Sequence, residues 1–224
     1  MKHLRVRALG VALAGWLLSP GALAEGAWLN RHSLAVHVPV KSWKTLRDAR
    51  IVKQNQDYSC GAASLAPLLN AHYRQDVTEE AILKAIDKGE GRASFEDMQR
   101  ALPTFGFKAQ GFAGSWEQLA KLKMPVIVYL KHRTDDHFSV LRGINAETVW
   151  LADPSLGSRT YSRQQFLEMW ETRAGDKAPS DLRGKFLAVL PATADIRASN
   201  DFFTRAPRRQ TAQAVGQLAV RHFP

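Results

Sequence analysis

The chain changes from polar residues to small and apolar ones within residues 54–63, which read Gln54-Asn55-Gln56-Asp57-Tyr58-Ser59-Cys60-Gly61-Ala62-Ala63. From Cys60 to His72 the residues are small or apolar, a pattern that favours a buried helix opening at the cysteine. A proline inside a helix removes a backbone hydrogen bond and clashes with the preceding turn, so we expect a kink at Pro67. Gly61 lets another segment approach the backbone closely. The helix that begins at Cys60 is therefore the central element of the predicted fold.

Three serines further along the chain each precede an apolar pattern and have a polar residue three positions later, the spacing of a helix capping box. They are Ser94, Ser115 and Ser162, and Thr78 precedes a fourth helix with an acidic first turn. Strand-like runs lie at residues 33–40, 107–112, 125–130, 137–144, 148–152, 159–161 and 185–190. Helices dominate the first half and antiparallel strands the second. This order predicts one α+β domain with N-terminal helices packed on an antiparallel sheet.

The first 24 residues have the three parts of an export signal. These are basic residues within 2–7, an apolar run at 8–18 and the small-residue site Ala22-Leu23-Ala24. The run is shorter than the ~20 residues that span a bilayer, so we expect cleavage after Ala24 and a periplasmic protein, with a short N-terminal anchor as the alternative. The remainder divides into an N-terminal extension (25–49), one domain (50–191) and a basic tail (192–224). For the tail we expect a loosely docked helix or a mobile end.

Composition sets broad limits on the class of protein. The 224 residues are 45% hydrophobic and 23% charged, which indicates one ordinary buried core and excludes a disordered or fibrous chain. The formal net charge is +10, and loss of the three basic residues of the signal leaves 28 basic against 21 acidic residues. This charge is diffuse and the tail lacks interleaved aromatics, so nucleic acid is not an expected partner. An anionic membrane surface or an acidic substrate fits better, and a merely solvated surface is the alternative.

Cys60 is the only cysteine in the chain, so no internal disulfide can form. An unpaired thiol in an oxidising compartment is open to oxidation, and its presence there needs a reason. A buried, inert core cysteine is one interpretation. At a helix N-terminus, however, the positive end of the helix dipole stabilises a thiolate. The position of Cys60 therefore predicts a nucleophile.

A cysteine nucleophile needs a base and a group that orients the base. Of the seven histidines, one lies in the signal, one in the tail, and three have no obvious carboxylate partner, which leaves His132 and His137. His137 opens a predicted strand, and the chain returns as a second strand that ends at Asp153. His132 has only Ser158 at its mirrored position.

The predicted hairpin brings His137 and Asp153 together. If it turns about Asn145, His137 faces Asp153, and the same register pairs Val140 with Trp150 and Leu141 with Val149. Directly opposed residues have Cβ atoms about 5 Å apart, within reach of a hydrogen bond between imidazole and carboxylate. We interpret His137 as the general base and Asp153 as its orienting partner, with an ordinary surface pair as the alternative.

The oxyanion that forms when a carbonyl is attacked needs hydrogen-bond donors. The side-chain amide of Gln54, six residues before the nucleophile, could act beside the Cys60 backbone N–H. Gln56 competes for the same role, and spacing alone does not decide between them.

The combined pattern Gln54-x5-Cys60-Gly61-Ala62-Ala63, His137-Phe138-x-Val140 and Asp153-Pro154-x-x-Gly157 resembles cysteine peptidase family thirty-nine. These papain-like enzymes are best known as bacteriocin-processing, double-glycine leader peptidases. The resemblance covers about residues 50–190 and implies a papain-like fold. It implies Cys60 as nucleophile, His137 as general base, Asp153 as its partner and Gln54, not Gln56, as oxyanion donor. The chain departs from the family at Ser59, where an aspartate is usual.

The resemblance implies a stand-alone, exported branch of that family, similar to members that serve functional-amyloid secretion. We therefore predict a periplasmic cysteine endopeptidase that processes a secreted or fibre-forming protein during export or assembly. No cofactor is expected, and no metal, since the histidines and the cysteine lack ligand spacing. The tail could contact a membrane or secretion machinery. A non-cleaving module that binds export substrates, or a thiol acyltransferase or amidase, are the alternatives.

Overall fold

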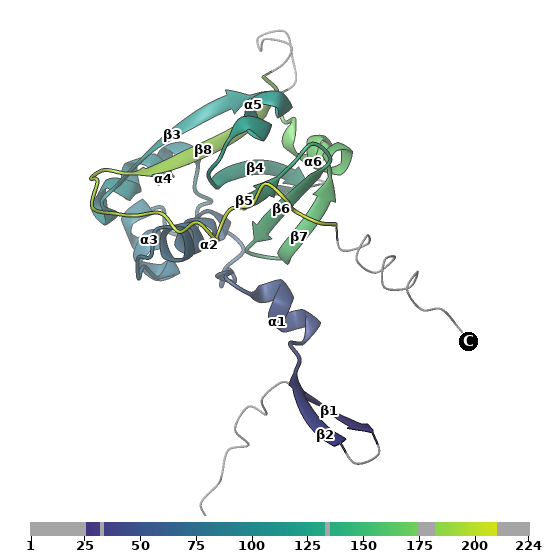
Figure 1. Cartoon of the computed structure of the whole chain (residues 1–224). Coiled ribbons are helices and arrows are strands. Elements are labelled where there is room, and N and C mark those ends of the chain that lie inside the picture. The colour runs from purple at the N-terminus through teal and green to yellow at the C-terminus, as the bar shows by residue number, and fades with distance from the viewer. Residues whose placement is uncertain (1–25, 32–33, 133–134, 174–181, 210–224) are drawn as a thin grey trace, which may run out of the picture. The chain divides into compact units, whose positions relative to one another are not determined.

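The computed structural model describes residues 26–31, 34–132, 135–173 and 182–209 (Figure 1). The chain forms two units, residues 1–42 and 43–224. The first contains the antiparallel hairpin of β1 (Gly26–Arg31) and β2 (Leu34–Pro39), in which Trp28 pairs with His37. The strand predicted at residues 33–40 is thus confirmed, whereas β1 was not predicted. The predicted export signal lies outside the described residues.

The second unit is built on a six-stranded antiparallel sheet in the order β3-β8-β4-β5-β6-β7 (Figure 1). All six of its strands were predicted. They are β3 (Phe107–Gly114), β4 (Val126–His132), β5 (Asp135–Ile144), β6 (Thr148–Asp153), β7 (Gly157–Ser162) and β8 (Gly184–Pro191). The predicted α+β architecture is therefore confirmed.

The central helix begins at Cys60, as predicted, and forms α2 (Cys60–Pro67). After Pro67 the chain continues as a π-helical turn, η1 (Leu68–His72). A proline cannot supply the N–H of a regular α-helical turn, and the change from α-helix to π-helix comes directly after Pro67, where a kink was predicted.

Three of the other helices begin at the predicted capping boxes, with both reciprocal hydrogen bonds formed at Ser94, Ser115 and Ser162. Thr78 caps a fourth helix by accepting a hydrogen bond from the Ala81 N–H. The short helix α1 was not predicted. The bounds are α1 (Trp43–Asp48), α3 (Glu79–Ile86), α4 (Phe95–Ala101), η2 (Leu102–Phe105), α5 (Trp116–Lys121) and α6 (Arg163–Trp170).

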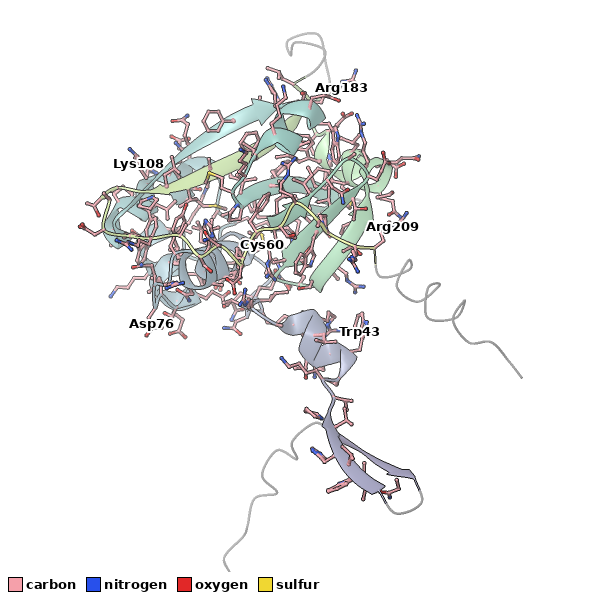
Figure 2. The ribbon with its side chains drawn as sticks, in the orientation of Figure 1. Trp43, Cys60, Asp76, Lys108, Arg183 and Arg209 are labelled. Carbon is pink, nitrogen blue, oxygen red and sulfur yellow. The ribbon has the colours of Figure 1, made fainter. Side chains whose placement is uncertain are left out.

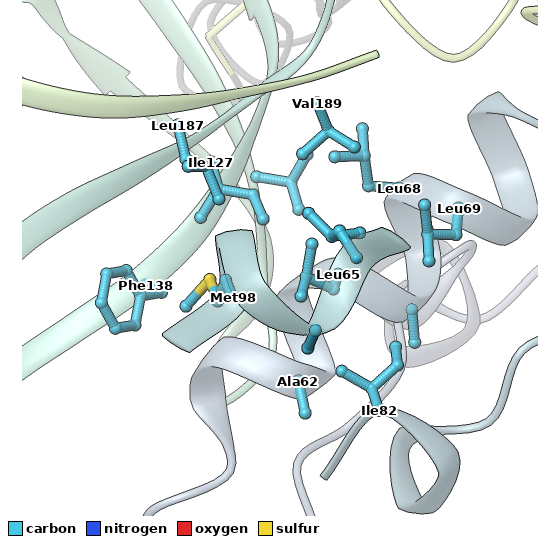
Figure 3. Close-up of a cluster of buried hydrophobic side chains, with 14 of the residues drawn as sticks. Ala62, Leu65, Leu68, Leu69, Ile82, Met98, Ile127, Phe138, Leu187 and Val189 are labelled. Atoms are coloured by element: carbon cyan, nitrogen blue, oxygen red, sulfur yellow. The ribbon is translucent and has the colours of Figure 1, made fainter. Parts of the chain in front are cut away.

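Helices cover both faces of the sheet because its strands alternate between two cores. On one face α2, α3 and α4 pack against β4, β5 and β8 through side chains such as Leu65, Met98 and Ile127 (Figure 3). On the other face α5 and α6 pack through Trp116 and Phe166. Such packing places the first residue of α2 beside the sheet. Among the described residues, no helix is long and apolar enough to cross a membrane.

The predicted register of the β5–β6 hairpin is wrong. Val140 pairs with Ala152, not with Trp150. The Asn145 side chain accepts hydrogen bonds from the backbone N–H groups of Glu147 and Thr148, so Asn145 begins the turn and does not sit at its centre. A bulge between Leu141 and Gly143 then shifts the pairing once more.

The chain continues along the domain beyond Pro191, where the sequence-based boundary was placed. Residues 192–209, the described part of the predicted tail, contain no helix. Phe202 is 1% exposed and belongs to the core that holds α2. Thr204 forms a parallel bridge with Gly143. This segment is therefore part of the packed domain, and residues 210–224 lie outside the described part of the chain.

Candidate active site

Cys60 is the first residue of α2 and is 3% exposed (Figure 2). The residue before it, Ser59, is fully buried and does not cap the helix with its side chain. Its hydroxyl instead donates to the backbone carbonyl of Gln56 at 2.9 Å, which closes the loop that leads into the helix. This arrangement leaves the thiol at the N-terminal end of the helix dipole, where a thiolate is stabilised.

His137 on β5 connects Cys60 with Asp153 on β6. Its Nε2 lies 2.9 Å from Oδ2 of Asp153, and Cys60 lies near enough to the imidazole to help raise its pKa. Because Nε2 is occupied by the carboxylate, Nδ1 is the ring nitrogen left for the sulfur. The structure thus brings three of the predicted site residues together in a chain of thiol, imidazole and carboxylate.

Asp153 reaches His137 diagonally across the hairpin, not from the directly opposed position that the sequence predicted. The observed register ends at the pair of Val140 and Ala152, so its continuation would set Asp153 opposite Ser139, two residues from His137. The buried Ser139 hydroxyl donates to Asp153 Oδ2 at 2.6 Å. Diagonal neighbours in a sheet lie farther apart than opposed ones, and the length of the histidine side chain covers the difference.

The second carboxylate oxygen of Asp153 is also occupied. Its Oδ1 accepts hydrogen bonds from the backbone N–H groups of Ser155 at 2.9 Å and Leu156 at 2.8 Å. The buried carboxylate therefore receives four hydrogen bonds and cannot rotate freely. Neither Ser139 nor Ser155 was singled out from the sequence, since isolated serines carry no motif.

The pKa values of His137 and Asp153 are shifted in opposite directions. Burial lowers the pKa of His137, but hydrogen bonds with Asp153 and Cys60 and the charges of both outweigh burial and raise it to about 9. Burial raises the pKa of Asp153, and here too the hydrogen bond and charge of His137 outweigh it, so the net shift is downward. Both shifts favour an imidazolium beside a carboxylate.

Gln54 and Gln56 have different surroundings. Gln54 is half-buried, and its Oε1 accepts a hydrogen bond from the Ser155 hydroxyl at 2.8 Å. Gln56 is exposed. Since Oε1 is engaged, the Nε2 group of Gln54 is left to donate elsewhere, as an oxyanion donor must. The contacts thus link Gln54 to the turn that carries Asp153.

A cavity of about 470 Å³ has Cys60 in its wall. Aromatic rings form part of it, with the Phe138 ring centroid 5.1 Å from that of Phe95 and 5.6 Å from that of Tyr129. Charged side chains of both signs complete the lining: Arg92, Glu96, Asp136 and Lys185. In the described part of the chain, no group of three or more His, Cys, Asp or Glu residues could hold a metal ion.

Comparison with known proteins gives matches over the part of the chain that carries this site. The model of the peptidase C39 family matches residues 48–174. A protein of Pseudomonas fluorescens named "Probable functional amyloid protease FapD" is 36% identical over an alignment 162 residues long, and the match covers 66% of this chain and 72% of that protein. Its namesake from Pseudomonas aeruginosa is 34% identical over an alignment 143 residues long, and the match covers 60% of this chain and 63% of that protein.

Among solved structures, a double-glycine-motif protease from an AMS/PCAT transporter, in complex with its leader peptide, is similar with a TM-score of 0.51. The two are 24% identical, and the match covers 63% of this chain and 90% of the other. This likeness shows the fold, so the predicted papain-like architecture is confirmed.

Proposed function

The chain belongs to the peptidase C39 family and is a cysteine peptidase, and we propose that it is a periplasmic endopeptidase that cuts a secreted partner protein during export or assembly. The observation that carries the proposal is the position of Cys60. The thiol lies at a helix start and contacts an imidazole whose other nitrogen is held by Asp153.

The proposed reaction follows from these contacts. Cys60 Sγ attacks the scissile carbonyl carbon, and the oxyanion accepts hydrogen bonds from the Cys60 N–H and from Nε2 of Gln54. His137 donates its Nδ1 proton to the leaving amine, which completes the thioester and releases the first product. His137 then removes a proton from a water molecule, which attacks the thioester carbonyl and frees Cys60.

The proposed substrate is an extended segment of a secreted, fibre-forming protein. Support comes from the two relatives, whose names describe a functional amyloid protease. The cavity beside Cys60 supports binding of a peptide segment, because it combines aromatic rings with charges of both signs. The periplasmic location is supported by the export signal predicted at residues 1–24.

Replacement of Cys60 by serine tests the proposal. The change is small and the site lies at a helix start, so Cys60→Ser is expected to fold, while the weaker nucleophile stops turnover. Cells that carry only this variant should accumulate an uncut partner protein and lose its fragments, as measured by mass spectrometry of periplasmic and secreted proteins.

Gln56→Ala is the matched control, because Gln56 lies four residues from Cys60, is exposed and has no proposed role. It should leave the fragments unchanged. If Cys60→Ser gives the same fragments as the unaltered protein, the thiol is not the working group. The domain would then be a module that holds export substrates without cutting them.

A further inference from the structure

Two loops that are distant in the sequence are tied together beside the candidate active site. The Gln54 backbone N–H donates to the Pro154 carbonyl at 3.2 Å, and Lys53 Nζ donates to the Ser155 carbonyl at 2.9 Å. The third bond joins the side chains of Ser155 and Gln54. One loop holds the predicted oxyanion donor and the other follows the carboxylate that orients His137.

Ser155 contacts both functional groups through different atoms. Its backbone N–H donates to Oδ1 of Asp153, and its hydroxyl donates to Oε1 of Gln54. A side-chain amide has an acceptor end and a donor end, so with Oε1 held by the Ser155 hydroxyl the NH₂ group of Gln54 remains available to donate.

We propose that Ser155 is a positioning residue of the peptidase, whose hydroxyl holds the Gln54 side chain by its Oε1 and so keeps the NH₂ group in place for the oxyanion. This inference rests on the proposed function, because it concerns the same reaction. The hydroxyl of Ser155 holds Gln54, and its backbone N–H holds Asp153. Only the contact with Gln54 depends on the side chain.

Two chemical probes separate oxyanion binding from thiol reactivity. p-Nitrophenyl acetate acylates a thiolate through a tetrahedral oxyanion: the S–C bond forms, p-nitrophenolate leaves, and water later hydrolyses the acetyl thioester. Iodoacetamide alkylates the same sulfur by displacing iodide, without an oxyanion. A group that acts only on the oxyanion therefore changes the rate of acylation by p-nitrophenyl acetate and leaves the rate of alkylation by iodoacetamide unchanged.

In the full-length chain, Ser155→Ala should lower the rate constant for acylation of Cys60 about 3- to 10-fold, the usual effect of one neutral hydrogen bond. The alkylation rate should stay within about twofold, because the alanine keeps the backbone N–H to Asp153. Ser155→Thr restores the hydroxyl at an exposed position and should restore acylation. Cys60→Ser gives the background reaction with other nucleophiles, which is subtracted.

A double variant identifies the residue through which Ser155 acts. Gln54→Ala should reduce acylation on the order of 10²–10³-fold, and adding Ser155→Ala to it should cause no further loss. The inference is overturned if Ser155→Ala acylates normally, if it reduces alkylation equally, or if its effect multiplies with that of Gln54→Ala. If the unaltered chain is acylated no faster than Cys60→Ser, the proposed function itself fails.

Discussion

His137 holds its position through contacts on both sides of the ring, and its charge depends on both. The carboxylate of Asp153 and the sulfur of Cys60 each stabilise the protonated imidazole, which is how a half-buried histidine reaches a pKa of about 9. At neutral pH the ring therefore carries a proton that it can give to a leaving amine. The four hydrogen bonds to Asp153 keep the orienting carboxylate ionised.

The first prediction at this scale concerns the titration of His137. Its imidazole C–H resonance in NMR should titrate near pH 9, and in both Cys60→Ser and Asp153→Asn the midpoint should move down toward the ordinary value of 6.5, because each variant removes an interaction that raises the pKa of His137. The resonance is assigned by its absence from the spectrum of His137→Gln. A midpoint near 6.5 in the unaltered protein would contradict the contacts described.

The same shifts fix how stability depends on pH. The raised pKa of His137 means that its contribution to folding is fully present below pH 6.5 and is lost as the pH rises through about 9. The lowered pKa of Asp153 means that its contribution is present above its ordinary value of 3.8 and is lost as the pH falls through the shifted one. The contributions of His137 and Asp153 to folding are therefore both fully present between about pH 3.8 and pH 6.5.

At the scale of elements, the start of α2 depends on how closely α4 approaches it. A Cβ atom at Gly61 would lie 2.5 Å from the Met98 methyl group and 3.2 Å from the Ala93 Cβ. The close approach that the sequence predicted at Gly61 is thus made by α4 and the residues before it. This contact holds the N-terminal turn of α2, and hence Cys60, against its neighbours.

Gly61→Ala should accordingly destabilise the protein by about 1–3 kcal/mol through overpacking. In a chain of this size that lowers the melting temperature by roughly 2–12 °C, measurable by calorimetry. Met98→Leu, which shortens the opposing side chain, should recover part of the loss. Gly111→Ala is the matched control, because its Cβ would meet no atom closer than 3.4 Å. Equal melting temperatures for the two alanine variants would refute the packing argument.

Local signals predicted the elements well, and long-range geometry was predicted less well. The capping boxes at Ser94 and Ser162 depend on residues three positions apart, so the sequence contains the whole signal. The hairpin register depends on a turn and a bulge at Asn145 and Arg142, and the bulge has no sequence marker. The contact between His137 and Asp153 forms because an imidazole tolerates a diagonal approach.

The choice between Gln54 and Gln56 shows the same limit. Both amides precede Cys60 at short spacing, and only the folded chain brings Ser155 to one of them. The motif of the family favoured Gln54, and the contact that distinguishes the two amides comes from Ser155, 101 residues away in the sequence. Ser139 and Ser155 could not be found from spacing for the same reason.

At the scale of the whole domain, residues 199–207 form a C-terminal strap that completes the core. The Cζ atom of Arg142 lies 4.4 Å from the ring centroid of Phe202 and 4.4 Å from that of Trp150. Backbone hydrogen bonds join Thr204 to Arg142 and Ile144 on β5. The strap thus packs against the strand that also carries His137, although it lies outside residues 48–174 that match the family.

Removal of the strap should therefore weaken the whole domain. A chain that ends at Pro191 loses Phe202 from the core and leaves the buried Arg142 cation with only one of its two ring contacts, that with Trp150. Loss of a buried phenylalanine side chain alone is worth about 3–5 kcal/mol, so a fall in melting temperature of roughly 6–20 °C is expected. Phe202→Ala in the full chain should reproduce much of this fall, which separates the ring from the rest of the strap. A chain that ends at Arg209 keeps every described contact of the strap and is the reference for the comparison. If the chain that ends at Pro191 melts at the same temperature as the one that ends at Arg209, the strap is not part of the core, and the domain boundary belongs at Pro191 after all.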